Sequence, residues 1–173
     1  YAAKSVSNWR DKLDETDKIK TEITEKKTEE VKLKVIGSEW AQKYKLTQNA
    51  LGINEKEYDV YRESVGFIES RNNPDQGSGG AGGHYYGMYQ FGTAATQTTT
   101  AYLKDNISKE DFEGNQDLAE KHFDCLSFLN HKTLMKKSPE YVKLSAREKL
   151  AILGYAHNQG AGGATKYLST GLI

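Results

Sequence analysis

Apolar residues recur at helical spacing over much of the chain after residue 38. The clearest case is the segment 55–70, which we expect to form a helix with one apolar face. Asn54 can cap its start, and Glu57 stands where a capping box requires it. Intervals of three and four residues separate the members of its apolar stripe, which are Tyr58, Tyr61, Val65 and Ile68. Glu69 follows this stripe in the last turn of the expected helix.

Similar patterns predict helices before and after this segment. Ser38 can cap a helix that runs through Leu46. Pro74 and the glycine-rich stretch 77–83 break the helical pattern, so a loop is expected there. Glycines separate the later helices, which we expect over about residues 93–103, 115–135, 145–157 and 161–168. The predicted fold class is mainly α, with a small loop or hairpin region.

The beginning of the chain has a different composition. Lys, Glu, Asp and Thr dominate residues 4–45, and apolar positions there are sparse. Residues 9–13 fit a short amphipathic helix, and the alternation over 30–35 fits a half-exposed strand. We therefore divide the chain into a charged N-terminal extension at 1–37 and a helical domain at 38–173. The extension is either a solvated linker or a segment that docks the domain on a larger assembly through a strand edge.

Bulk properties argue against several classes of function. Lys plus Arg equals Asp plus Glu at 24 each, so no net charge directs the chain to nucleic acid or anionic lipid. No apolar run reaches the ~18–20 residues of a membrane span. Cys125 is the only cysteine, and its apolar neighbours predict a buried thiol without a catalytic role. The spacing of the four histidines is not that of a zinc site, so we expect no metal and no cofactor.

Three separated motifs carry the candidate chemistry: Glu-Ser-Arg-Asn-Asn-Pro at 69–74, Gly-Met-Tyr-Gln-Phe at 87–91 and Tyr-Ala-His-Asn-Gln-Gly at 155–160. A carboxyl group at a helix end can be half-buried against apolar neighbours, and partial desolvation favours its neutral, proton-donating form. Glu69 is therefore a candidate general acid. A plain surface role is the alternative, and Glu63 is the competing carboxylate.

The second motif combines aromatic rings with a polar side chain. Sugar rings can stack on the aromatic faces, and Gln90 can both donate and accept hydrogen bonds. Gly87 would let the backbone approach a ligand closely. A packed aromatic hairpin is the alternative for this segment. In the third motif, Asn158 can line a polar groove or simply end a helix.

The order of these motifs resembles that of lytic transglycosylases and goose-type lysozymes. Those families carry Glu-Ser, then a stretch like Gly-Leu-Met-Gln, then a turn like Ala-Tyr-Asn-Ala-Gly. The resemblance covers roughly residues 60–168. It implies a protein with a lysozyme-like helical fold that cleaves bacterial peptidoglycan.

Carried over by position, the resemblance implies that Glu69 is the general acid and base and that Ser70 supports the bound sugar. The substrate groove would be lined by Gly87, Met88, Tyr89 and Gln90. Of these, Met88 and Tyr89 stand where the families usually have Leu and Met. In the third motif, Asn158 would also face the groove.

His157 occupies the position of a tyrosine that lies near the catalytic Glu in those families. A histidine can replace the phenol as a hydrogen-bond donor, but it also gains charge near neutral pH, which would add pH dependence. The glycine-containing turn at 160–163 looks like variants in phage cell-wall enzymes. We therefore expect a virion-associated protein or one exported to the bacterial cell wall or periplasm.

Two reactions fit the resemblance, both at the β-1,4 bond between N-acetylmuramic acid and N-acetylglucosamine. In a lytic transglycosylase one Glu protonates the leaving oxygen and then deprotonates the C6 hydroxyl of the muramic acid, which closes an anhydro ring. A goose-type muramidase would use a second carboxylate to hold water, and Asp75 is the acidic residue between the first two motifs. A turn-stabilising role of Asp75 is the alternative. A non-catalytic glycan-binding virion component is the rival from another class, and a chitin-type substrate is left open.

Overall fold

The computed structural model describes residues 12–21, 37–79 and 82–170. Most of these residues are helical, and their strand pairing is limited to antiparallel bridges between Gly79 and Tyr85 and between Tyr86 and Phe91. The named helices are α2 (Glu39–Lys43), α3 (Leu46–Leu51), α4 (Glu55–Ser70), α5 (Thr93–Leu103), the 3-10 helix η1 (Lys109–Phe112), α6 (Gln116–Lys137), α7 (Pro139–Val142) and α8 (Ala146–Ser169). The predicted mainly α class is confirmed.

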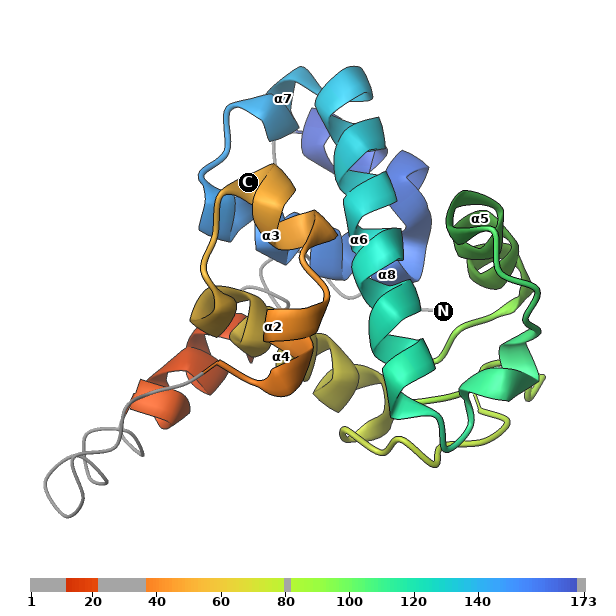
Figure 1. Cartoon of the computed structure of the whole chain (residues 1–173). Helices are drawn as coiled ribbons and strands as arrows, with labels where there is room; N and C mark the ends of the chain where they lie inside the picture. The colour runs from red at the N-terminus through yellow and green to blue at the C-terminus, as the bar shows by residue number, and fades with distance from the viewer. Residues whose placement is uncertain (1–11, 22–36, 80–81, 171–173) are drawn as a thin grey trace, which may run out of the picture.

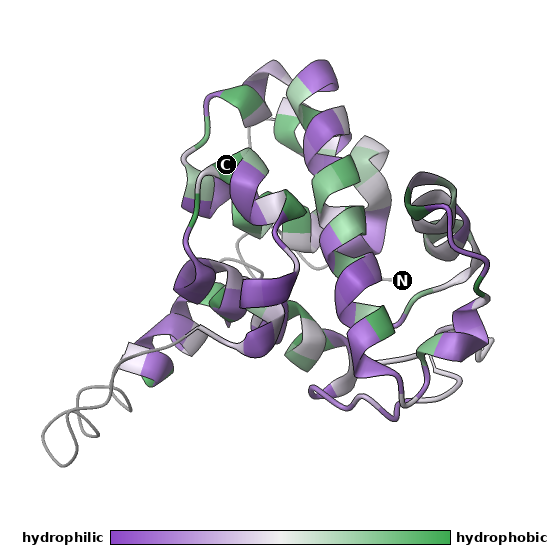
Figure 2. Ribbon diagram, in the orientation of Figure 1, coloured by the Kyte–Doolittle hydropathy of each residue, from purple (hydrophilic) through white to green (hydrophobic). Residues whose placement is uncertain are grey.

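The long helix α6 organises the rest of the domain. It packs against α3, α5, α7, α8 and η1, while α4 packs against α2 and α8. Figure 1 shows α5 on one side of α6 and α2 with α3 on the other. Figure 2 shows hydrophilic and hydrophobic residues alternating along α6, as expected for a helix that faces both core and solvent. The loop between α4 and α5, which carries the second motif, closes the end of the domain near the start of α6.

Aromatic side chains from separate elements meet in the core. The ring of Tyr89 stacks on that of Phe123 with 4.0 Å between centroids, and Tyr61 approaches Phe123 at 5.4 Å. All three side chains are buried. Burying a side chain of this size contributes about 1.5–3 kcal/mol to stability. The second motif is therefore anchored between α4 and α6.

The sequence predicted α4 with its correct ends. Asn54 caps it, and the reciprocal bonds of the capping box to Glu57 are both present at 2.8 and 2.9 Å. Ser38 caps α2 as expected, but the helix predicted to run through Leu46 is interrupted after Lys43. The reason is a tertiary contact, because the carboxylate of Asp124 on α6 accepts from the backbone N–H groups of Leu46 and Thr47 at 3.0 Å each.

The two helices predicted near the C-terminus are joined in α8 across a kink at Gly160. This residue has φ 73° and ψ 164°, a conformation that is essentially confined to glycine. The predicted break is therefore confirmed. It places the third motif on the last turn before the kink.

Part of the N-terminal extension is described. Residues 12–21 are helical, and Leu13 is buried in the core. Lys20 pairs with Asp59 of α4, with 2.7 Å between Nζ and Oδ2. The strand expected over 30–35 lies outside the described residues. The helix at 12–21 therefore packs on the domain and does not stand apart from it.

The buried thiol is also found as predicted. Burial raises the pKa of Cys125 to about 12, so the reactive thiolate is suppressed.

Within the described ranges, no helix is both long and apolar enough to cross a bilayer.

Candidate active site

Glu69 and Ser70 form the last turn of α4, immediately before the chain changes direction. Arg71 and Asn72 both adopt left-handed conformations, with φ of 60° and 59°. Their N–H groups donate to the carbonyls of Phe67 at 3.0 Å and Gly66 at 3.1 Å, an arrangement that ends a helix and satisfies its last carbonyls. The turn leaves both side chains of the first motif half-buried at the end of the helix.

Ser70 joins the first motif to the second. Its hydroxyl donates to the carbonyl oxygen of Met88 at 2.7 Å and accepts from the N–H of Asn73 at 3.1 Å. Gly66 allows this close approach, because a Cβ there would collide with the side chains of Met88 and Asn72. Ser70 therefore positions the second motif against the end of α4.

The third motif contacts the other two through neighbouring residues. Asn158 Nδ2 donates to Glu69 Oε1 over 3.4 Å, which is long for a hydrogen bond. His157 Nε2 lies 2.7 Å from the carbonyl oxygen of Tyr89, to which it must donate, and its Nδ1 is buried without a partner. In the structure Asn158, and not His157, contacts the candidate acid Glu69. The family pattern had implied that the residue at position 157 lies near this acid. The three motifs form a closed set of contacts.

A cleft of about 750 Å³ opens beside this set, within the ~300–1,000 Å³ typical of ligand sites. Its walls come from α5, η1, the bridged loop, α6 and α8. Three of the predicted substrate-binding residues line it: Gln90, His157 and Asn158. Glu69 is not among the lining residues and borders the cleft through Asn158. Other lining residues include His84, Tyr85, Thr98, Lys109 and Asn130.

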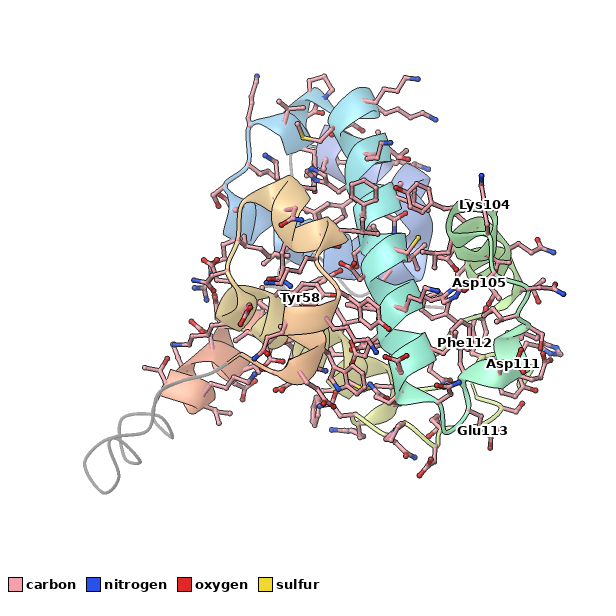
Figure 3. The ribbon with its side chains drawn as sticks, viewed as in Figure 1. Tyr58, Lys104, Asp105, Asp111, Phe112 and Glu113 are labelled. Atoms are coloured by element: carbon pink, nitrogen blue, oxygen red, sulfur yellow. The ribbon has the colours of Figure 1, made fainter. Side chains whose placement is uncertain are left out.

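The remaining residues of the second motif are buried. Gly87 has φ 78°, and a Cβ there would lie 2.9 Å from Cβ of Phe112 and 3.1 Å from its carbonyl oxygen. Figure 3 labels Phe112 on η1, and its ring lies 5.1 Å from that of His122 on α6. Glycine is thus required at this position by packing against η1. None of Gly87, Met88 and Tyr89 lines the cleft. These buried residues support it.

A buried polar network holds Tyr89. Its hydroxyl lies 2.8 Å from both carboxylate oxygens of Glu120, which also accepts from Arg62 at 2.8 Å and from Gln116 at 2.7 Å. Burial raises the pKa of Glu120 although Arg62 and the hydrogen bonds oppose this effect. Burial likewise raises the pKa of Tyr89 well above its usual value, so the phenol stays protonated and donates.

Sequence reasoning missed this network. The available signal was the place of Arg62 on the apolar face of α4, four residues after Tyr58 and three before Val65. A charged residue on a buried face requires a partner. Glu120 could not be identified as that partner from spacing, because it is 58 residues away along the chain.

Glu63 and Asp75, the two carboxylates that compete with Glu69 as candidates, do not lie in the wall of the cleft. Glu63 pairs with Lys20 at 2.9 Å and lies 3.6 Å from Arg62. Asp75 is exposed, and its turn is organised by Asn73, whose side-chain oxygen accepts from the Asp75 N–H at 3.0 Å. Neither carboxylate lines the cleft. In the part of the chain that is described, no group of three or more His, Cys, Asp or Glu side chains could hold a metal ion.

Comparison with known proteins gives no further assignment. No family model, no curated protein and no solved structure matches the chain. The function must therefore be argued from the geometry of the site.

Proposed function

We propose that this protein is a lytic transglycosylase that cleaves the β-1,4 bond between N-acetylmuramic acid and N-acetylglucosamine in bacterial peptidoglycan. The observation that carries the proposal is the closed set of contacts among the three motifs, which places Glu69 beside Asn158 at the border of a ligand-sized cleft. The lysozyme-like type of the fold is part of this proposal.

Glu69 would act twice in the reaction. Its carboxyl group first donates a proton to the leaving glycosidic oxygen, and the resulting carboxylate then takes the proton of the C6 hydroxyl, which attacks C1. Ser70, held by the Met88 carbonyl, fixes the helix end that presents Glu69. The exposed ring of Tyr85 in the cleft offers a face for stacking on a sugar.

The setting of Asp75, the candidate second carboxylate, favours transglycosylation over hydrolysis. Asp75 is exposed in a turn organised by Asn73, whereas Glu69 contacts Asn158 of the cleft wall. Hydrolytic glycosidases use a second carboxyl group about 5–9.5 Å from the first. An internal C6 hydroxyl needs only the one group that delivers and removes protons. A goose-type muramidase that recruits Asp75 is the hydrolytic alternative.

One observation favours a second candidate, a glycan-binding structural component that does not cleave. Glu69 contacts the cleft through the long bond to Asn158 and does not line it. A glycan strand in the cleft could then be held by the amides without reaching an acid.

In either case we propose that the protein acts at the cell wall, in a virion or after export. The N-terminal segment would join it to a larger phage or secretion assembly.

The proposal is tested by the release of soluble fragments from purified peptidoglycan. Glu69→Gln keeps the shape of the side chain but cannot donate the proton, and general acid catalysis contributes about 10²–10⁴-fold. We expect a loss in that range. Glu39→Gln is the matched control, because Glu39 is exposed on α2 and does not line the cleft. Equal activity of the parent and Glu69→Gln would contradict the assignment, and an inactive parent that still binds glycan would favour the structural alternative.

A further inference from the structure

The cleft contains a lysine that has no ion-pair partner among the described residues. Among the described residues that line it, Lys109 is the only Lys or Arg, and none is an Asp or Glu. Lys109 makes no ion pair within the described part of the chain. Its Nζ lies over the ring of Tyr86, 5.9 Å from the ring centroid. A half-buried lysine in a cleft with no Asp or Glu among its described lining residues can bind an anionic group of a ligand.

The position of Lys109 is fixed by η1. Phe112 at the end of this helix is buried and packs against Phe91, with 4.9 Å between ring centroids. Asp111 on the same short helix is engaged elsewhere, because its carboxylate accepts from the backbone N–H of Ser108 at 2.8 Å. Asp111 therefore caps η1, and among the described residues it makes no ion pair with Lys109.

The amide side chains of the cleft do not distinguish peptidoglycan from chitin. Gln90, Asn130 and Asn158 line it with neutral amides. Amides suit hydroxyl and N-acetyl groups, which both polymers carry. The two polymers differ in charge, since muramic acid bears a lactyl group that ends in a carboxylate or in an acidic stem peptide.

We infer that Lys109 is a specificity-determining residue that pairs with a carboxylate on the muramic acid side of the strand, an inference that rests on the proposed function. The carboxylate belongs to the lactyl group in a strand without peptides and to the stem peptide in an intact strand. Chitin has neither. Lys109 thereby makes the cleft prefer peptidoglycan over a neutral glycan of the same backbone.

The test is a binding measurement, which does not depend on cleavage. Isothermal titration calorimetry on the full chain carrying Glu69→Gln compares three ligands: chitohexaose, peptide-stripped glycan strands, and uncrosslinked strands that keep their stem peptides. Lys109→Gln and Lys109→Arg are each added to this background. Lys132→Gln is the matched control, because Lys132 is exposed on α6, lies over the ring of Phe128 at 5.5 Å, and does not line the cleft.

Lys109→Gln is expected to weaken carboxylate-bearing ligands about fivefold, near the upper limit for a solvent-screened ion pair, and to leave chitohexaose unchanged. Lys109→Arg retains the preference, Lys132→Gln has no effect, and the difference shrinks in ~0.5 M salt. A loss with peptide-stripped strands identifies the lactyl carboxylate, whereas a loss confined to intact strands identifies the stem peptide.

An unchanged affinity for both carboxylate ligands would overturn the inference, as would an equal loss for chitohexaose. Both outcomes leave the proposed function intact, provided that the parent chain cleaves peptidoglycan. If no glycan binds the Glu69→Gln chain and the parent releases no fragments, the proposed function fails and this inference fails with it.

Discussion

Asn158 on α8 donates a hydrogen bond to Glu69 at the end of α4, with 3.4 Å between Nδ2 and Oε1 and 89 positions between the two residues in the sequence. The contact orients the candidate acid from outside its own helix. A carboxyl group must be held in productive geometry to transfer a proton in the transition state. The Asn158 amide is therefore a positioning group for the proposed reaction.

We predict that Asn158→Ala lowers kcat about tenfold, which corresponds to roughly 1.4 kcal/mol of transition-state stabilisation. The bond is exposed, so the free energy of unfolding should change by less than about 0.5 kcal/mol. Steady-state kinetics on soluble glycan strands and denaturant unfolding measure the two quantities. An unchanged kcat would show that Glu69 does not need this contact.

Local patterns in the sequence were sufficient for α4 and its end. The capping residues Asn54 and Glu57 and the apolar stripe marked the helix, and the same reasoning placed Glu69 in its last turn. The kink at Gly160 also followed from a local cause, because a glycine interrupts a helical pattern. These features depend on neighbours within a few residues along the chain.

Features that depend on distant residues were not predictable. The break between α2 and α3 arises where Asp124 caps the second helix from 78 residues away. The partner of Glu69 depends on how α8 is rotated at the third motif, which places Asn158 and not His157 beside it. Helical periodicity identifies a buried face, but it does not identify the side chains that meet there.

The buried Glu120 is predicted to be essential for stability. Glu120→Ala removes the most deeply buried of the carboxylates around Arg62, which keeps Asp59 at 2.8 Å. Breaking a buried ion pair costs about 3–5 kcal/mol, and because Asp59 remains we expect a loss of about 3 kcal/mol. The double variant Arg62→Met with Glu120→Leu removes both charges and should recover part of the loss. Urea unfolding provides the measurement.

The control for this prediction is Asp117→Ala. Asp117 pairs with Lys43 at the surface, where its side chain is 51% exposed, and such pairs contribute at most about 1 kcal/mol. Similar losses from Glu120→Ala and Asp117→Ala would contradict the importance assigned to the buried network.

A pH dependence of stability is predicted from His131. Burial, and to a smaller extent the charge of Lys149, lower the pKa of His131 below its usual value of 6.5. The unfolded chain therefore binds a proton near pH 6.5 that the folded chain does not. The contribution to stability is present above pH 6.5 and is lost as the pH falls towards the lower pKa of the folded state.

His131→Gln should remove this contribution, so the variant loses less unfolding free energy than the parent between about pH 7 and pH 5. The difference between the two proteins is the relevant quantity, because burial raises the pKa of Glu120 and Asp124 and these groups act in the opposite direction. His84→Gln at an exposed position is the control. Parallel curves for the parent and His131→Gln would refute the assignment.

Gly160 and Gly162 provide a matched pair on α8. No atom lies within 4 Å of a Cβ built at either position, but only Gly160 has a positive φ. Gly160→Ala should cost about 1–3 kcal/mol through backbone strain alone, whereas Gly162→Ala should stabilise by about 0.4–1 kcal/mol. Thermal unfolding of the two variants gives the comparison. Equal effects would mean that the kink is not required by the fold.

The measurement that tests the central claim most directly is the mass of the fragments released from purified peptidoglycan by the parent, Glu69→Gln and Asp75→Asn. We predict products lighter by one water than hydrolytic fragments, as anhydromuramic acid ends require, from the parent and from Asp75→Asn but not from Glu69→Gln. Ordinary reducing ends that disappear with Asp75→Asn would contradict the account and show that the protein is a hydrolase with two carboxylates.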